Sequence, residues 1–364
     1  MDKRRVGILT WHYFINFGSA LQAYAVQRSI EKMGAEATII NYQDPKYSGK
    51  PWKDTLRYYI GKLSKFFPDR FAMRFGYPYQ QFQKHYMHLT RQAASKDEVS
   101  NIARNMDVLV CGSDQIWAPN VFNPIYMMDF DTRPNVRKVS YAASIGLERI
   151  PQDKVEQYTR LLCGFDAISV RETKGKNLLM QRCGVDSSVV LDPTLLLDQE
   201  EYRVMERCVS GIKQPYIFCY FLNKDHTYRR SVEKYAKENG YAIYGSTLRL
   251  DDQEWMHRMQ YIGPGEFIWL IEHARAVFTD SYHGTIFSML FHKPFCVFER
   301  FSNNDPICQN SRIEQLGIWF DMKSHLRSAD EDICICSAMD SKRFEMDLHV
   351  AREASLAYLK GALG

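Results

Sequence analysis

The sequence predicts an α/β protein made of two doubly wound domains, and three observations indicate this class. Short apolar runs rich in Val, Ile and Phe alternate with helical segments along most of the chain. Clusters rich in Gly, Ser and Asp directly follow several of these runs, and the alternation starts afresh after about residue 214. The 364 residues, 45% of them hydrophobic, suffice for two ordinary domain cores.

The chain opens with a strand, a helix and a second strand. Residues 5–10 (RVGILT) form an apolar run typical of a buried strand, and a loop follows it. A helix is predicted over residues 20–33, with Ser19 as its N-cap and Gly34 as its stop. Residues 37–41 (ATIIN) form the next strand. A strand–helix–strand unit of this kind implies a parallel sheet.

Residues 47–86 interrupt this alternation with twelve aromatic residues and eight Lys or Arg, against two acids. We expect a helical insertion in the N-terminal domain, over about residues 47–100. A packed subdomain with solvated basic faces is the favoured interpretation. Contact with a membrane interface comes second, because Trp, Tyr and Phe beside Lys and Arg suit the headgroup region. Nucleic acid ranks last and is not expected, since the net charge is only +4 and no recognised motif is present.

The alternation of strands and helices resumes after this insertion and continues to the end of the chain. In the N-terminal domain, further elements are predicted as strands 106–111, 138–143, 167–170 and 188–191, with a helix that ends near Cys183. In the second domain, strands are predicted over 216–221, 241–244 and 277–279, and helices over 226–239, 266–274, 285–291 and 343–359. The expected domain limits are therefore 1–200 and 212–364.

Cysteine usage and the lack of long apolar segments indicate a cytoplasmic protein. The nine cysteines are odd in number and scattered, which is typical of reduced and mostly buried thiols. The close pair Cys334 and Cys336 has no further ligand nearby in the sequence, so no metal site is expected. The start, MDKRRVGILTW, lacks the apolar core of a signal peptide, and no run approaches eighteen apolar residues. A peripheral position at the inner face of the membrane is compatible with the aromatic insertion.

Polar clusters follow the ends of several predicted strands, where open parallel sheets bind their ligands. Four clusters belong to the N-terminal domain and one to the C-terminal domain, so a site built from all of them would lie in a cleft between the domains. The candidate substrate-binding residues in these clusters are Asn16, Gly18, Ser19, Gly112, Ser113, Asp114, Ser144, Arg171, Ser281 and Gly284.

His283 is the candidate for acid–base chemistry, because histidine is the commonest general acid or base. It stands where a strand turns into a helix, and Gly284 permits close approach of the backbone to an anion. The local pattern is equally compatible with a histidine that merely caps the helix. Arg171 suits bidentate binding of a carboxylate or phosphate, although a surface ion pair with Glu172 explains the same pattern.

Six stretches that follow one another between residues 16 and 295 together resemble the polysaccharide pyruvyl transferase family. They are NFGSALQAYAVQ, LVCGSDQIWAPN, VSYAASIG, ISVRE, VVLDPTLLL and FTDSYHGTIFSMLFHKPF. The resemblance implies two Rossmann-like domains that face a cleft, as in GT-B glycosyltransferases. It also implies transfer of a pyruvyl group from phosphoenolpyruvate to a sugar, forming a cyclic ketal, in the synthesis of an exopolysaccharide or of the cell envelope. Phosphoenolpyruvate would be the donor substrate, and no cofactor is expected.

The same resemblance assigns roles to individual residues. His283 matches the histidine of the family, and Arg171 matches the arginine of its V-R-[ED] motif. Well-studied branches carry an arginine two residues before the histidine, where this chain has Ser281. A second phosphate-binding cation must then come from elsewhere, with Arg312 and Arg300 as candidates, or else the donor is bound differently or is not phosphoenolpyruvate.

Two further functions stay open on the sequence. A GT-B-type glycosyltransferase would use a nucleotide sugar, and Glu266 after a Gly-Pro-Gly segment would suit a ribose contact. A non-catalytic glycan-binding subunit is the other alternative, against which the presence of His283 and Arg171 argues. The expected partner in each case is a sugar or oligosaccharide, and a lipid-linked acceptor fits if the insertion contacts a membrane. The sequence does not indicate the oligomeric state.

Overall fold

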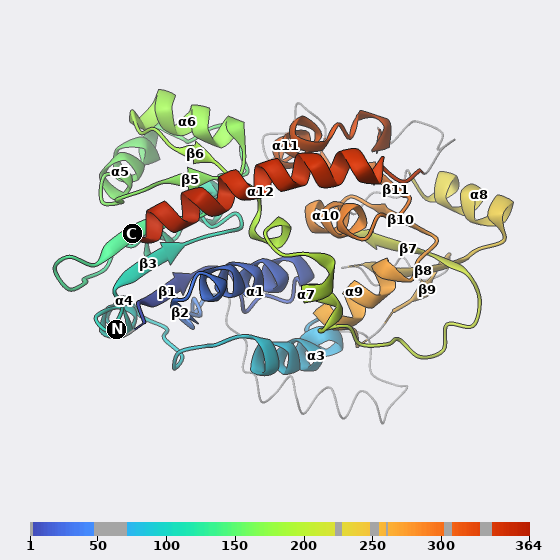
Figure 1. The fold of residues 1–364 in the computed structure, drawn as a ribbon, viewed down its shortest axis with the longest axis horizontal. Coiled ribbons are helices and arrows are strands. Elements are labelled where there is room, and N and C mark those ends of the chain that lie inside the picture. Colours follow the sequence, from blue (N-terminus) through green and yellow to red (C-terminus); the bar gives the residue numbers. More distant parts are fainter. Residues whose placement is uncertain are drawn as a thin grey trace.

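Two parallel sheets flanked by helices lie side by side in the protein (Figure 1). The computed structural model describes residues 3–46, 71–222, 228–247, 255–259, 261–301, 308–327 and 337–364. Residues 47–70 of the predicted insertion, the start of the predicted helix 226–239 and the Cys334–Cys336 pair lie outside these residues. The predicted class, two Rossmann-like doubly wound α/β domains, is confirmed.

The N-terminal sheet has the order β2-β1-β3-β4, and every pair in it is parallel. Its strands are β1 (Arg5–Leu9), β2 (Glu36–Ile39), β3 (Val108–Cys111) and β4 (Arg137–Ser140). A parallel pair, β5 (Ser169–Val170) and β6 (Ser188–Val189), continues beside β4 through a bridge between Val139 and Ala167. Helices α5 (Gln152–Leu162) and α6 (Thr173–Cys183) accompany this pair. Strand β3 is buried throughout, as expected for a strand covered on both faces.

Helix α1 (Phe17–Lys32) begins three residues earlier than the sequence pattern indicates. Asn16, rather than Ser19, is the N-cap, because the Asn16 side chain accepts a hydrogen bond from the Ser19 backbone N–H at 3.2 Å. This leaves the Ser19 hydroxyl free to donate to Asp114 Oδ2 at 2.6 Å. The correction matters because it turns the Ser19 side chain from a capping group into a group that faces the other polar clusters.

The C-terminal sheet is also parallel and has the order β12-β11-β10-β7-β8-β9. Its strands are β7 (Tyr216–Phe221), β8 (Ala242–Thr247), β9 (His257–Arg258), β10 (Ala276–Thr279), β11 (Phe295–Phe298) and β12 (Leu326–Arg327). Its helices are α8 (Arg229–Asn239), α9 (Pro264–Glu272), α10 (Tyr282–Leu290) and α11 (Ser311–Phe320). Strand β11 and helix α11 were not predicted, since a four-residue strand after a proline gives little pattern.

Three further helices lie in the connections between the strands. Helix α3 (Phe71–Tyr86) and helix α4 (Lys96–Ala103) confirm that this end is helical. Helix α7 (Gln199–Arg203) lies in the segment that joins the two sheets. No helix among the described residues has both the length and the apolar composition needed to cross a membrane.

Helices α1 and α12 hold the two halves together. Phe17 at the start of α1 stacks on Phe267 of α9 with a centroid distance of 4.7 Å. Helix α12 (Ser341–Leu363) begins beside α11 and ends against the N-terminal sheet, where Tyr358 donates to the Ser140 carbonyl at 3.0 Å (Figure 1). The last helix therefore contacts helix α11 of the second domain and strand β4 of the first, and the domain limits 1–200 and 212–364 stay a prediction.

Candidate functional site

A cavity of about 370 Å³ lies at the carboxyl ends of the strands, between the two domains. Six of the predicted site residues line it, namely Asn16, Ser19, Asp114, Ser281, His283 and Arg312. Its remaining walls come from the loop after β1, from the segments around Asp44 and Asn123, and from Tyr282 and Arg300. The cavity thus brings together residues far apart in the sequence, from both domains.

His283 lies in the first turn of α10 and packs directly against the first turn of α1. A Cβ atom on Gly18 would lie only 2.0 Å from His283 Nδ1, so a glycine is required for this contact. Ser281 is the N-cap of α10 and accepts a hydrogen bond from the Gly284 N–H at 3.3 Å. A Cβ on Gly284 would lie 2.5 Å from Thr279 Oγ1, so Gly284 serves helix packing on β10.

Asp192 lies behind the histidine and connects it to Arg171. Its Oδ2 lies 3.7 Å from His283 Nε2, a close charge contact that is longer than a hydrogen bond, and 2.6 Å from Arg171 Nη1. Its Oδ1 accepts hydrogen bonds from the backbone and hydroxyl of Thr194. Burial opposes its ionisation, but His283 and Arg171 outweigh burial and hold the pKa of Asp192 well below its usual range.

This arrangement places a carboxylate beside one ring nitrogen of His283. The Nε2 atom is buried beside a carboxylate, which favours a proton on that nitrogen. The other ring nitrogen, Nδ1, lies against Gly18 at the start of α1, and His283 lines the cavity. A buried carboxylate that orients a histidine is a recurrent arrangement in acid–base catalysis.

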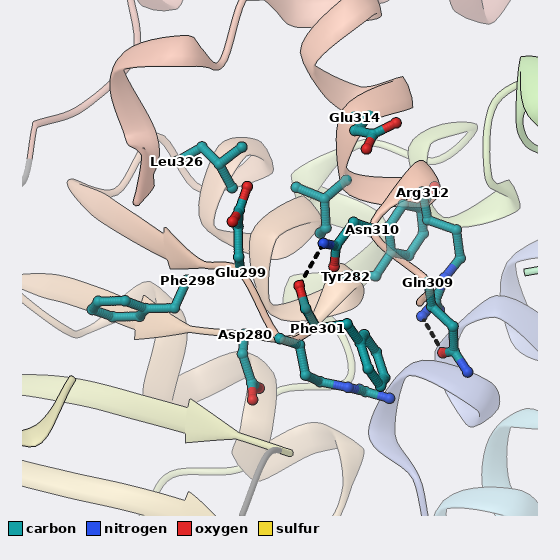
Figure 2. A pocket seen from close by; sticks show the side chains of 12 residues that line it. Asp280, Tyr282, Phe298, Glu299, Phe301, Gln309, Asn310, Arg312, Glu314 and Leu326 are labelled. Atoms are coloured by element: carbon teal, nitrogen blue, oxygen red, sulfur yellow. Dashed lines mark hydrogen bonds between the residues drawn. The ribbon is translucent and has the colours of Figure 1, made fainter. Parts of the chain in front are cut away.

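Two arginines lie close to the ring of Tyr282, on the side of the cavity formed by the C-terminal domain. The guanidinium carbon of Arg171 lies 4.5 Å from the ring centroid of Tyr282, and that of Arg312 lies 5.7 Å from it. A smaller hollow of about 20 Å³, lined by Tyr282, Arg300 and Arg312, adjoins this end. Figure 2 shows Arg312 there with its hydrogen bond to Gln309, which is 2.8 Å long.

The charge of Arg312 is poorly compensated by its surroundings. Its Nε atom is buried and has no hydrogen-bond partner among the described residues. Burial and the positive charges of Arg171 and Arg300 lower the pKa of Arg312 to about 9. An anion in the cavity would relieve both the repulsion and the missing hydrogen bond, so this end of the site is suited to an anionic ligand.

The other predicted site residues lie beneath the cavity wall. Gly112 has a φ of +123°, and a Cβ there would lie 2.1 Å from the Tyr141 carbonyl. The Ser113 hydroxyl donates to the Ala142 carbonyl at 2.8 Å, and Arg171 is buried behind Tyr282. Gly18, Gly112, Ser113, Ser144, Arg171 and Gly284 are not among the residues that line the cavity.

Three residues that the sequence singled out have other partners in the structure than those expected. Ser144 and the backbone N–H groups of Ile145 and Gly146 all donate to Glu172 Oε1, at 3.0 to 3.2 Å. The predicted surface ion pair of Arg171 with Glu172 is wrong, because the buried Arg171 pairs with Asp192 instead. Glu266 accepts a hydrogen bond from the Gly263 N–H at 2.8 Å as part of the α9 cap, and it does not line the cavity.

Asp192 and Tyr282 were missed as site residues. Asp192 follows strand β6 in the stretch LDPT, so its place after a strand end was a usable signal. Tyr282 lies between two residues that were singled out, but an aromatic residue beside a buried helix is more often part of a core. Among the described residues, no three His, Cys, Asp or Glu side chains cluster as metal ligands would, and the expected lack of a metal stays a prediction.

The architecture matches that of solved sugar-nucleotide epimerases. The UDP-GlcNAc 2-epimerase of Methanocaldococcus jannaschii aligns with a TM-score of 0.50 at 11% identity, covering 96% of this chain and 93% of that one. The Neisseria meningitidis enzyme, solved with bound UDP-GlcNAc, aligns with a TM-score of 0.50 at 10% identity, covering 99% and 94%. At such identities the likeness shows the fold alone, and the predicted GT-B-like arrangement is confirmed.

The sequence itself gives the family. The family model for polysaccharide pyruvyl transferases matches residues 16–303, which span all five polar clusters and the cavity residue Arg300. The chain belongs to the polysaccharide pyruvyl transferase family, a family of transferases that act on polysaccharides. None of the curated protein sequences matches this chain.

Proposed function

We propose that this protein transfers a pyruvyl group from phosphoenolpyruvate to a sugar of a polysaccharide or its precursor, forming a cyclic ketal. The observation that carries the proposal is the poorly compensated Arg312 guanidinium in the same cavity as His283. Phosphoenolpyruvate carries both a phosphate and a carboxylate, so it requires a strongly cationic site. A group that exchanges protons is required as well, and His283 with Asp192 behind it provides one.

The atoms and charges of the reaction balance when a single residue first donates a proton and then accepts one. The methylene carbon of phosphoenolpyruvate gains a proton and becomes a methyl group, which makes the central carbon electrophilic. One sugar hydroxyl adds to that carbon and releases its proton. The bond between the central carbon and the phosphate oxygen breaks, and a second hydroxyl adds in its place. Of the two hydroxyl protons, one replaces the proton spent on the methyl group and the other leaves with hydrogen phosphate.

His283 is the residue that we assign to these proton transfers. As an imidazolium it protonates the methylene carbon, and as an imidazole it accepts a proton from the attacking hydroxyl. The carboxylate of Asp192 lies 3.7 Å from Nε2, on the inner side of the ring. Arg171 holds Asp192 in place and adds positive charge from behind Tyr282, so we assign it as a positioning residue.

Arg312, assisted by Arg300, takes the place of the arginine that other branches carry at the position of Ser281. Ser281 is committed to capping α10, whereas Arg312 reaches the cavity from the first turn of α11. Both Arg300 and Arg312 line the cavity and the adjoining hollow, so a phosphate held there would contact two guanidinium groups. Asn16, Ser19, Asp114 and Ser281 also line the cavity, and we assign them to substrate binding.

The test is turnover of phosphoenolpyruvate in the presence of a panel of oligosaccharides. Phosphate release that depends on the acceptor, together with a ketal methyl signal by NMR, is the expected result. His283→Ala should abolish both, whereas His273→Ala, an exposed histidine outside the cavity, should leave both unchanged. Turnover of a nucleotide sugar instead would identify a glycosyltransferase, and glycan binding without any turnover would identify a binding subunit.

A further inference from the structure

The loop after β1 exposes three aromatic side chains to the cavity. Trp11, Tyr13 and Phe14 all line it, and each is only partly buried. Their rings contact one another, with centroid distances of 5.4 Å between Trp11 and Phe14 and 4.3 Å between Tyr13 and Phe14. Adjoining aromatic rings left partly exposed in a cavity indicate a surface that binds a ligand.

The backbone of this loop is fixed from beneath. Gln22 of α1 donates to the Trp11 carbonyl at 3.0 Å, and Gln83 of α3 donates to the His12 carbonyl at 2.6 Å. The His12 side chain is fully buried and lies 3.0 Å from Asn41 Oδ1 through its Nε2. These contacts hold the loop in place, so the three rings form a preorganised platform.

A carboxylate with a fixed orientation lines the cavity together with the platform. Asn123 Nδ2 donates to Asp44 Oδ2 at 2.9 Å, and the Lys46 backbone N–H donates to Asp44 Oδ1 at 2.9 Å. The carbonyl oxygen of the Asn123 side chain accepts from the Ile125 N–H at 3.0 Å, which fixes Asn123 in turn. Each oxygen of Asp44 keeps a further lone pair with which to accept a ligand hydroxyl.

We propose that Trp11, Tyr13, Phe14, Asp44 and Asn123 form the acceptor subsite, and that it takes a neutral hexose. Aromatic rings suit the apolar face of a sugar, and the carboxylate suits a pair of hydroxyl donors. The same carboxylate repels an acidic sugar, because two negative charges would then be brought together away from bulk water. The role of this sugar as the acceptor rests on the proposed function, whereas the binding of the sugar does not.

Binding is measured by saturation-transfer NMR with the methyl glycosides of glucose, galactose and mannose, and with that of glucuronic acid. At least one neutral glycoside should bind the wild-type protein, and the glucuronide should bind at least about tenfold more weakly. Trp11→Ala and Asp44→Asn should each weaken neutral-sugar binding about tenfold or more, while phosphoenolpyruvate affinity stays within about twofold. Trp269→Ala and Asp153→Asn, which alter residues outside the cavity, should bind as the wild type does.

The outcomes separate this inference from the proposed function. No binding of any neutral glycoside, equal binding of the glucuronide, or unchanged binding by Asp44→Asn would each overturn it. Asp44→Asn preserves the side-chain shape, so it decides the matter even if Trp11→Ala fails to fold. Sugar binding that depends on Trp11 and Asp44 without any phosphoenolpyruvate turnover would support the subsite and refute the proposed function. Phosphoenolpyruvate turnover in which Trp11→Ala and Asp44→Asn both keep the wild-type KM for the sugar would support the proposed function and refute the subsite.

Discussion

Replacing Gly18 by Ala tests how the two domains place the histidine. The added Cβ would lie 2.0 Å from His283 Nδ1 and 2.4 Å from its Cγ, whereas atoms in contact stay about 3.5 Å apart. The ring must therefore move by about 1.5 Å, or the two helices must separate by as much. A displacement of about 1 Å at a reacting group can cost about a hundredfold in rate. We expect Gly18→Ala to lower kcat by about this factor without any change to the histidine itself.

The assay is phosphate release from phosphoenolpyruvate with an acceptor sugar, read beside the imidazole signals of His283 by NMR. Gly361→Ala is the matched control, because Gly361 also lies in a helix and its added Cβ would meet nothing within 4 Å. That control should keep full activity and gain up to about 1 kcal/mol of stability from helix propensity. A folded Gly18→Ala protein with unchanged imidazole signals and a rate within about threefold of the wild type would refute the reasoning.

Three further predictions concern charge. Since burial and neighbouring arginines lower the pKa of Arg312 to about 9, its charge is lost above that pH, and phosphoenolpyruvate affinity should fall as the pH rises through about 9. Calorimetry on the wild type and Arg312→Ala measures this, and a flat wild-type profile contradicts it. Replacing Asp192 by Asn removes the closer ion-pair partner of the buried Arg171 and should lower the free energy of unfolding by about 3 kcal/mol. Urea denaturation measures the loss, and a value below about 1 kcal/mol speaks against this pairing. Burial and the neighbouring Glu272 raise the pKa of Glu206 from 4.5 to about 8, so the folded protein holds a proton that the unfolded chain releases, and stability should fall as the pH rises from about 4.5 to about 8 and level off above that. Melting temperatures from about pH 6 to pH 9 show the fall, which Glu206→Gln should remove; equal slopes in both proteins would exclude this source.

Local patterns in the sequence were enough to place most strands and the polar clusters after them. Strand β7 was predicted with its observed bounds, Tyr216–Phe221, because six apolar residues lie between clear turn signals. Helix α1 was placed with the wrong start, since Asn16 and Ser19 are both good N-caps and only the folded backbone selects one. Strand β11 has only four residues and was missed for lack of a pattern.

The sequence did not indicate which residues of each polar cluster line the cavity and which lie buried beneath it. The stretch Gly112-Ser113-Asp114 is continuous in sequence, yet Asp114 lines the cavity while Ser113 is buried beneath it. Ser144 resembles a ligand-binding residue but binds Glu172 of its own chain. Residues that bind a ligand and residues that support the site are both polar and both follow strand ends, so their sequence signals coincide.

The family, the parallel α/β class and His283 as the candidate catalytic residue all followed from the sequence alone, because these depend on the order of strands and on motifs of a few residues. The folded chain was needed to show that Gly18 makes room for His283, that Asp192 lies behind it, and that Arg312 lines the same cavity. Asp192 and His283 are 91 positions apart, and their contact arises where helices from two domains meet. Hydrophobic periodicity shows which face of one helix or strand is buried. A contact between two distant residues depends instead on how separate helices and sheets pack together.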